Sequence, residues 1–282
     1  MANPLVEQAN KIYRHCRQNS IETRRDYRKC FNAFCEWLWN RYRVKKLRNI
    51  SNKHLRQYVV YHLYELDNAP SYIYKILSAI RFFHDFVSDP RYELERRNAV
   101  LGVPKRKKSG DRGWTAEEFE YMVGRAAEKG FYKLISLLVL GWELGLRIHE
   151  AVRLYRVDLE RALKSGYLKA KGKGGKERHI KLTPIAVREL QVLKEKTPRG
   201  ARVFVPEGER AHKVIYWIQK FIYENRPERE GEPLTYHGLR YSYAQRKYYT
   251  IKDQGLSTRE AEKEVSKDLG HNRPKVTRGY LG

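Results

Sequence analysis

The sequence predicts a mainly helical protein with a small β component, built from two domains that a basic linker joins. Apolar residues recur at helical spacing through the first hundred positions, and a stretch rich in glycine and lysine then interrupts the pattern. Beyond it, a glycine-lysine turn separates two short strand-like runs. The chain has 282 residues, enough for two ordinary domains. We expect a helical domain over residues 1–103, a linker over 104–112 and an α+β domain over 113–282.

The first domain should contain helices that begin after serines able to cap the first turn. These serines are Ser20, Ser51 and Ser71. Each is followed by an apolar stripe with spacings of three or four residues: Tyr27, Phe31, Phe34 and Leu38; then Leu55, Val59 and Leu63; then Ile73, Leu77, Ile80 and Phe83. Such stripes indicate helix faces that pack into a core, rather than rings that stack on bases.

The segment between the domains, GVPKRKKSGDRGW, combines structure-breaking residues with a run of like charges. Its basic cluster consists of Lys105, Arg106, Lys107 and Lys108. An isolated run of this kind is usually a solvated surface. Between two basic domains, we favour the interpretation that it follows a phosphate backbone.

The second domain should begin with a helix that a capping box opens, formed by Thr115 and Glu118. The nearly all-apolar segment FYKLISLLVLGWELG is too short to span a membrane and is typical of a buried helix, which Gly145 should end in the left-handed conformation. The segment YLKAKGKGGKERHIKL predicts two strands around a tight turn.

The rest of this domain should be helical apart from a short strand at 203–205. Its helix signals are, in chain order, Thr183 with Pro184, the residues from His212 onwards, and the capping box of Ser257 and Glu260 with Gly270 as the end. A further short helix after Gly270 should carry Tyr280.

The charge balance points to a polyanionic partner. Lysine and arginine total 58 against 33 acidic residues, a formal net charge of +25 that is spread along the whole chain. Nucleic acid is the first candidate and a membrane surface the second. No apolar run is long enough to span a bilayer, and the N-terminus lacks the apolar core of a signal peptide, so we expect a cytoplasmic protein with no membrane partner. The spacings of Cys16, Cys30 and Cys35 suit neither a zinc site nor a disulfide framework.

Two groups of polar residues could carry chemistry in the second domain. Arg147 follows the expected helix end at Gly145, where a buried guanidinium needs a partner; an ion pair with Glu150 is an equally good interpretation. His237 and Arg240 are three residues apart and would share a helix face, as an anion clamp or as unrelated surface residues. The segment IHEAVR does not match the HExxH zinc pattern.

The turn between the two expected strands forms a third group. Lys171, Lys173 and Lys176 would project from the hairpin that KGKGGKER predicts. A basic hairpin can enter a DNA groove and bring an ammonium group near a phosphate. Taken alone, an ordinary solvated turn would explain the same residues.

Together and in this order, four motifs resemble the tyrosine recombinase (phage integrase) family, which includes Xer-like site-specific recombinases. The motifs are GLRIHEAVRL, GKGGKERHIKL, HGLRYSYA and LGHNRPKVTRGY, and they cover roughly residues 113–282. The resemblance implies an α+β catalytic domain with a short β-hairpin. The helical N-terminal part is similar to the core-binding domain of the family by position and helix content.

The resemblance assigns catalytic roles to Arg147, Lys173, His237, Arg240, His271 and Tyr280. It implies that Tyr280 is the nucleophile, that the two arginines hold the phosphate, and that Lys173 protonates the leaving group. The histidines would contact the phosphate or take the tyrosine proton, and the sequence leaves their division of work open. Lys171 and Lys176 on the hairpin, with the four-residue linker cluster, are the expected DNA contacts. No cofactor and no metal is implied.

The implied activity is cleavage and rejoining of DNA through a 3′-phosphotyrosyl intermediate, with strands exchanged between two sites. The implied partners are double-stranded DNA and further copies of the chain, as a homotetramer on two sites and a monomer or weak dimer in free solution. Many family members continue beyond the tyrosine into a segment that docks on a neighbouring protomer, whereas Leu281 and Gly282 alone follow Tyr280 here. The alternatives are a nicking and resealing enzyme similar to type IB topoisomerases, and a non-catalytic DNA-binding protein on the same scaffold.

Overall fold

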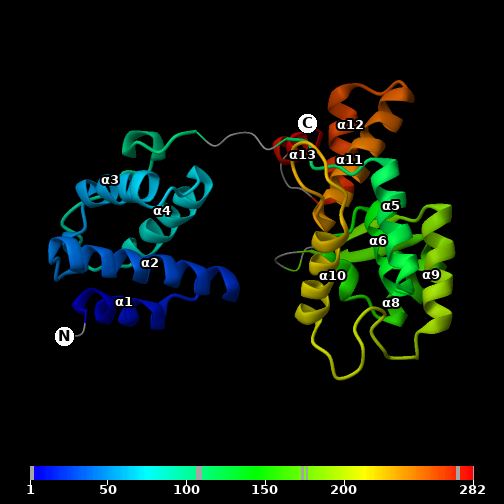
Figure 1. Cartoon of the computed structure of the whole chain (residues 1–282), viewed down its shortest axis with the longest axis horizontal. Helices are drawn as coiled ribbons and strands as arrows, with labels where there is room; N and C mark the ends of the chain where they lie inside the picture. Colours follow the sequence, from blue (N-terminus) through cyan, green and yellow to red (C-terminus); the bar gives the residue numbers. More distant parts are fainter. Residues whose placement is uncertain (1–2, 106–109, 173–174, 176, 271–273, 282) are drawn as a thin grey trace. The chain divides into compact units, whose positions relative to one another are not determined.

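The computed structural model describes residues 3–105, 110–172, 175, 177–270 and 274–281, with no statement on the side chains of 274–276. Two compact units make up the chain: unit 1, Met1–Lys108, and unit 2, Ser109–Gly282 (Figure 1). Helices dominate both units, and unit 2 holds the two-stranded sheet of the described residues. The prediction of a mainly helical fold with a small β component is confirmed.

Unit 1 is a small bundle of helices. Its long elements are α1 (Pro4–His15), α2 (Ile21–Tyr42), α3 (Asn52–Val60) and α4 (Pro70–His84), with 3-10 turns at Leu47–Asn49 and Asn98–Leu101 and a π turn at Tyr61–Glu65. Ser20 caps α2 by accepting the N–H of Thr23. The expected cap at Ser71 is wrong, because α4 begins one residue earlier at Pro70, whose fixed φ already suits the first helical position.

The core of unit 1 is largely aromatic. Phe31, Phe34 and Phe83 are fully buried, and the rings of Phe31 and Phe83 lie 5.3 Å apart between their centroids. These residues belong to the stripes that the sequence marks as core, and the prediction is confirmed. The three cysteines are free and buried in the same region.

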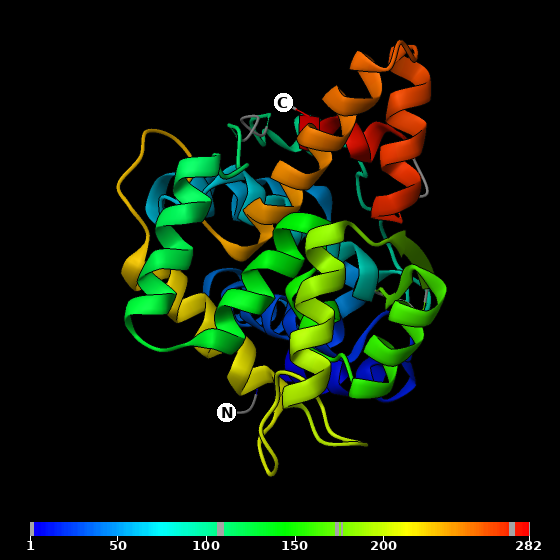
Figure 2. The same ribbon diagram turned by 90° about the vertical axis from the view of Figure 1, so that its right-hand side faces the viewer.

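Unit 2 is built around α6 (Tyr132–Leu144), the apolar helix of the sequence. Its other helices are α5 (Ala116–Glu128), α7 (Ile148–Val152), α8 (Arg156–Ser165), α9 (Pro184–Lys196), α10 (Ala211–Asn225), α11 (Tyr236–Asp253), α12 (Thr258–Leu269) and α13 (Pro274–Leu281) (Figure 2). Helix α6 contacts α5, α7, α9 and α11, which is why its residues can be apolar on nearly every side. The expected capping boxes before α5 and α12 are both present.

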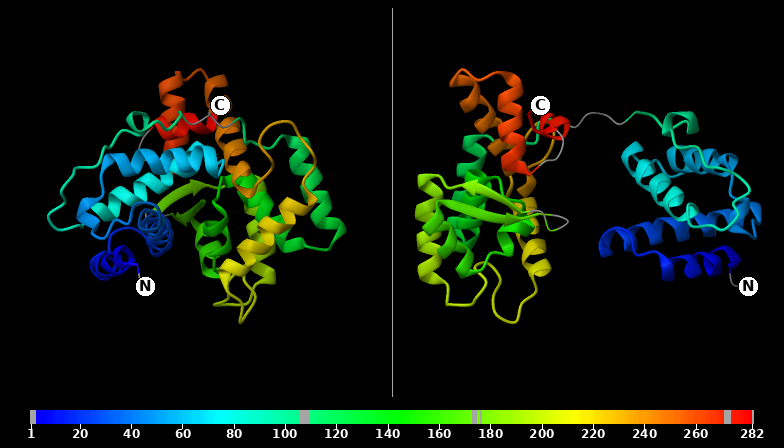
Figure 3. Two further views of the ribbon diagram at one scale, coloured as in Figure 1. Left: turned by 60° about the vertical axis from the view of Figure 1, so that its left-hand side comes forward. Right: turned by 180° about the vertical axis from the view of Figure 1, so that it is seen from behind.

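Strands β1 (Tyr167–Lys171) and β2 (Glu177–Lys181) form the expected antiparallel hairpin, with Tyr167 opposite Lys181 and Lys171 opposite Glu177. β1 packs against α8, and β2 reaches α12 (Figure 3). The expected strand at 203–205 is wrong. These residues are buried, but the β-pairing there is one isolated bridge between Tyr155 and Arg202. Their apolar side chains fill the core without a neighbouring strand to extend that bridge.

The last three helices pack against one another at one end of unit 2 (Figures 1 and 2). Asp268, near the end of α12, accepts hydrogen bonds from Tyr243 and Lys247 of α11. Gly270 then ends α12 in the left-handed conformation, with φ of 64°. Tyr280 and Leu281 of α13 pack against the apolar cluster between α11 and α12. Within the described parts of both units, no helix combines the length and the apolar character that crossing a membrane requires.

Candidate active site

The turn after α6 places Arg147. Gly145 adopts φ of 58°, and a Cβ at this position would lie 2.5 Å from Cδ1 of Tyr243, so that glycine alone fits. Arg147 precedes α7, and its Nη1 donates to Oε1 of Glu150 at 2.9 Å. About a quarter of the Arg147 side chain stays exposed (26%). The ion pair with Glu150 therefore exists, and it holds a guanidinium that solvent can still reach.

Glu150 is the buried carboxylate that holds the arginines together. Its Oε2 accepts from Nη2 of Arg178 at 2.7 Å. Burial alone would raise the pKa of Glu150, but the charges of Arg178 and Arg147 and a backbone hydrogen bond lower it below its usual value. Glu150 is thus ionised in the folded protein at neutral pH.

Arg178 was missed in the sequence, where it looked like one more charge of a basic hairpin. It occupies an inward position of β2, and its pKa is lowered chiefly by burial. The signal that could have revealed it is the two-residue alternation of β2, in which Arg178 and Ile180 share the buried face.

Arg240 lies on α11 and is fully buried. Its two terminal nitrogens donate to carbonyl oxygens, to Gly145 at 2.7 Å and to Leu269. Arg178 donates to the same two carbonyls. The two guanidinium groups therefore bridge the C-terminal ends of α6 and α12, where helix dipoles favour positive charge. Burial, and then repulsion from Arg178 and Arg147, lower the pKa of Arg240 to about 9.

Tyr280 of α13 reaches this cluster. Its hydroxyl lies 3.2 Å from Nε2 of His237, and the Arg240 guanidinium carbon lies 5.9 Å from the centre of its ring. The ring of Tyr241 stacks on that of Tyr280, with 4.2 Å between centroids and 26° between planes. His237 and Arg240, three residues apart on α11, thus face the same tyrosine.

His237 is neutral at physiological pH. Partial burial, followed by the charges of Arg240, Arg147 and Arg112, lowers its pKa to about 4. The residue is nevertheless exposed to solvent. A neutral imidazole beside a phenol can accept the phenolic proton, which is the first requirement for activating a tyrosine as a nucleophile.

The structure brings together Arg147, His237, Arg240 and Tyr280. Lys173 and His271 lie outside the described residues, as do Lys176 of the hairpin and Arg106, Lys107 and Lys108 of the linker. Lys171 and Lys105 are described, and both are exposed. Among the described residues no group of histidine, cysteine or carboxylate side chains could hold a metal ion.

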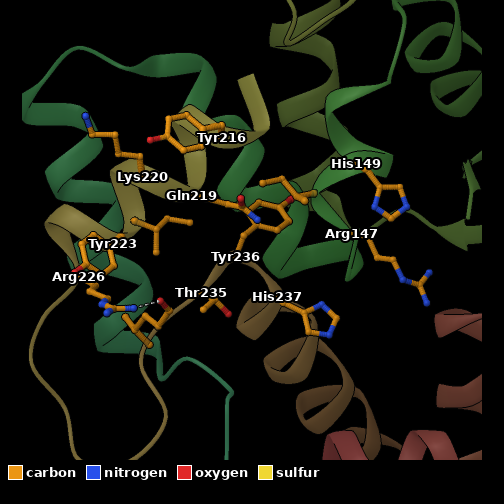
Figure 4. Close-up of a pocket in the computed structure, with 13 residues that line it drawn as sticks. Arg147, His149, Tyr216, Gln219, Lys220, Tyr223, Arg226, Thr235, Tyr236 and His237 are labelled. Atoms are coloured by element: carbon orange, nitrogen blue, oxygen red, sulfur yellow. Dashed lines mark hydrogen bonds between the residues drawn. The ribbon is translucent and has the colours of Figure 1, made fainter. Parts of the chain in front are cut away.

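A pocket of about 640 Å³ opens beside Arg147 and His237 (Figure 4). Five residues of α10 line it. Three of them, Tyr216, Lys220 and Tyr223, have spacings of four and three, which put them on one helix face. Tyr216 and Tyr223 are both about two-thirds exposed. This aromatic and basic face was not predicted from the sequence, although the spacing of the two tyrosines around Lys220 could have indicated it.

Comparisons with known proteins agree in both units. Residues 12–89 match the family model described as phage integrase, N-terminal SAM-like domain. Tyrosine recombinase XerD of Halalkalibacterium halodurans is 26% identical over 247 residues, which cover 83% of this chain and 79% of the relative. A putative integrase/recombinase, y4eF of Sinorhizobium fredii, is 27% identical over 240 residues, or 82% of this chain and 87% of the relative.

Solved structures share the fold. The Tn1549 transposon integrase in complex with transposon right end DNA has a TM-score of 0.70 at 14% identity, covering 99% of this chain and 94% of the other. A lambda integrase dimer bound to a COC′ core site has a TM-score of 0.70 at 18% identity, covering 99% and 76%. The N-terminal family match and the relatives that span most of the chain lead to one conclusion: this chain is similar to tyrosine recombinases over most of its length.

Proposed function

We propose that this chain is a site-specific DNA recombinase that cleaves and rejoins DNA through a 3′-phosphotyrosyl intermediate and exchanges strands between two sites. The observation that carries the proposal is the Tyr280 hydroxyl, which lies within hydrogen-bonding distance of a neutral histidine and beside buried positive charge. A nucleophile, a proton acceptor and cations for a developing negative charge are what phosphodiester cleavage by a tyrosine requires.

In the proposed reaction, His237 accepts the proton of Tyr280, and the phenolate oxygen attacks phosphorus. The bond to the 5′-oxygen breaks, and that oxygen leaves with a proton. Arg147, whose head is partly exposed, pairs with the non-bridging oxygens, while Arg240 contributes positive charge from beneath the Tyr280 ring. Lys173 is our proposed donor of the proton to the leaving 5′-oxygen, on the strength of its motif, with His271 as a second histidine.

Rejoining is the same step in reverse. A free 5′-hydroxyl, from the same strand or from a second site, attacks the phosphotyrosyl bond and releases Tyr280. Each transfer replaces one phosphoester by another, so strand exchange needs no nucleotide cofactor.

DNA would contact both units. Exposed Lys171 on the hairpin and Lys105 of the linker are proposed phosphate contacts, together with the linker residues 106–108 and Lys176. The α10 face of Tyr216, Lys220 and Tyr223 borders the pocket beside Arg147, which supports DNA at this edge (Figure 4). We propose unit 1 as the core-binding domain and unit 2 as the catalytic domain, acting on cytoplasmic DNA.

Strand exchange between two sites requires several copies of the enzyme. We propose a homotetramer on two DNA sites, with a monomer or weak dimer in free solution. One structural neighbour, lambda integrase, is described as a tetramer bound to a Holliday junction, and its fold matches 99% of this chain with a TM-score of 0.66. A topoisomerase-like activity would need no second site, and the relatives that span most of the chain are recombinases.

The nucleophile provides the first test. The target site would first be selected from genomic fragments and built into a nicked suicide duplex, on which wild-type protein should form a covalent 3′-phosphotyrosyl adduct without divalent metal. Tyr280→Phe should bind this duplex with unchanged affinity and form no adduct, because the attacking oxygen is missing. Denaturing electrophoresis measures the adduct.

Tyr249→Phe is the matched control, since Tyr249 is an exposed tyrosine of α11, and it should behave as wild type. An adduct that persists in Tyr280→Phe and maps to another tyrosine would contradict the assignment of the nucleophile.

A further inference from the structure

Tyr241 follows Arg240 directly on α11, and the proposed reaction gives it no role. Its ring lies face to face with that of Tyr280, at 4.2 Å and 26°. His237 meets the same Tyr280 ring edge-on, at 5.7 Å and 72°. The proposed nucleophile is therefore held on two sides by neighbouring side chains of one helix.

We propose that Tyr241 is a positioning residue, which fixes the ring plane of Tyr280 so that its hydroxyl points at His237. This inference rests on the proposed function, because it concerns the ring that would attack DNA. Tyr241 would touch neither the phosphorus nor the leaving oxygen, and it would act through Tyr280 alone.

The rest of α13 holds the helix, and the plane of the Tyr280 ring depends on the side chains that contact the ring itself. Thr277 is fully buried, Leu281 packs on the cluster between α11 and α12, and Nε of Arg278 donates to Glu262 at 2.9 Å. These contacts fix the backbone near Tyr280. A tyrosine side chain still has two rotatable bonds, and a hydrogen bond of 3.2 Å at its tip lets the ring turn about that contact. A stacked neighbour removes this freedom, since offset stacking has a preferred geometry.

Tyr241 is itself held in place. Burial raises the pKa of Tyr241, and the nearby charge of Arg112 opposes that rise; Nη2 of Arg112 lies 3.4 Å from Oε2 of Glu232. The backbone carbonyl of Arg112 occupies the space where a Cβ of residue 238 would be, so Gly238 allows this segment to run against α11. A series of contacts thus connects Glu232, Arg112, Tyr241 and Tyr280.

The test compares Tyr241→Leu with Tyr241→Phe in the full chain. Phenylalanine keeps the stacked ring and loses the hydroxyl, whereas leucine keeps bulk and loses the stack. Under single-turnover conditions at saturating suicide duplex, Tyr241→Leu should form the adduct about tenfold more slowly, and Tyr241→Phe within about twofold of wild type. Affinity for the duplex, from mobility shift, should be unchanged in both, because the effect lies in orientation rather than binding.

Tyr249→Leu is the matched control on the same helix and should keep the wild-type rate. Thermal melting checks the fold, and if Tyr241→Leu melts early, Tyr241→His provides a second flat ring that should restore most of the rate. Adduct formation by Tyr241→Leu at the wild-type rate would overturn the inference, and so would a Tyr241→Phe as slow as Tyr241→Leu. Either of these two outcomes would leave the proposed function intact, because wild-type protein would still form the adduct. If wild-type protein forms no adduct, the proposed function and this inference are both overturned.

Discussion

The core of unit 1 and the arginine cluster of unit 2, which consists of Arg178 and Arg240 with Glu150, are both buried. The first is made of apolar rings and the second of charged groups. In unit 1, aromatic rings such as Phe31 and Phe83 contact one another. In unit 2, Arg178 and Arg240 lie side by side on the carbonyls of Gly145 and Leu269, with Glu150 as the carboxylate. The core of unit 1 removes apolar surface from water, and the arginine cluster of unit 2 removes charged groups from water.

The two kinds of burial have opposite energetic consequences. Apolar burial stabilises a fold by roughly 25 cal/mol per Å². Burying ions is costly, and replacing a buried ion pair by apolar residues of similar volume is often neutral or stabilising. Packing alone therefore gives no reason for the arginine cluster. We therefore attribute the cluster to the chemistry proposed for the neighbouring Tyr280.

The largest expected effect comes from removing the carboxylate. Glu150→Ala should destabilise unit 2 by about 3–5 kcal/mol, because the buried Arg178 loses its counter-ion. Hydrogen exchange of peptides from α6 and α11, measured against peptides from α2 and α4, would assign the loss to unit 2.

Glu160→Ala is the control, since Glu160 pairs with Arg156 at 2.9 Å at the surface of α8; its loss should be about 0.3–0.5 kcal/mol. The double variant Glu150→Leu with Arg178→Met should regain most of the stability of unit 2 that Glu150→Ala loses. It should nevertheless cleave no DNA. A Glu150→Ala protein as stable as wild type would remove the basis of the comparison.

The aromatic core should respond more mildly. Phe31→Leu keeps an apolar side chain in unit 1 and should cost about 1–1.5 kcal/mol, because the neighbouring rings can partly close the gap. The same hydrogen-exchange peptides measure it, and adduct formation at saturating DNA should stay at the wild-type rate. A loss of cleavage without loss of DNA binding would mean that unit 1 contributes to the chemistry.

The smallest effect is that of mild acid. Burial lowers the pKa of His62 and His84 in unit 1, so both bind protons less readily in the folded protein than in the unfolded chain, and acidification through pH 6.5 favours unfolding. The stability of unit 1 should therefore fall slightly from pH 7.5 to 5.5. The lowered pKa of Glu150 means that its contribution is lost only at lower pH, below its unfolded value of 4.5. Denaturation at the two pH values measures the difference, and stability that rises on acidification would contradict it.

The sequence predicted the fold best where local chemistry decides the structure. Thr115 with Glu118, and Gly145 after an apolar run, define helix ends through bonds and angles within a few residues. Residues 203–205 show the opposite case, because an apolar run cannot report whether a partner strand exists. The π turn at Tyr61–Glu65 left no pattern that distinguishes it from a continuing helix.

The candidate site was predictable only in part, because some of its contacts join residues that are far apart in the sequence. The ordered motifs pointed to Arg147, His237, Arg240 and Tyr280, and the structure places Tyr280 beside His237 and Arg240. Arg178 contacts Leu269, 91 residues further along the chain, and Tyr241 contacts Tyr280, 39 residues further along, so their partners cannot be predicted from neighbouring positions. In a hairpin rich in lysine and arginine, a buried arginine such as Arg178 cannot be distinguished from the exposed ones until the register of the strand is known.

The two carbonyl groups that receive Arg178 and Arg240 belong to the main chain, and no codon change can delete them. A scan of side-chain substitutions would therefore detect the loss of the guanidinium donors, but it would not test the carbonyl oxygens that accept these hydrogen bonds. Leu269 would look like an ordinary core leucine in such a scan, although its carbonyl oxygen serves both arginines. Side-chain substitutions in this protein will therefore underestimate how much the backbone contributes to the site. An amide-to-ester replacement after Leu269, which weakens its carbonyl oxygen as an acceptor, would reveal that contribution.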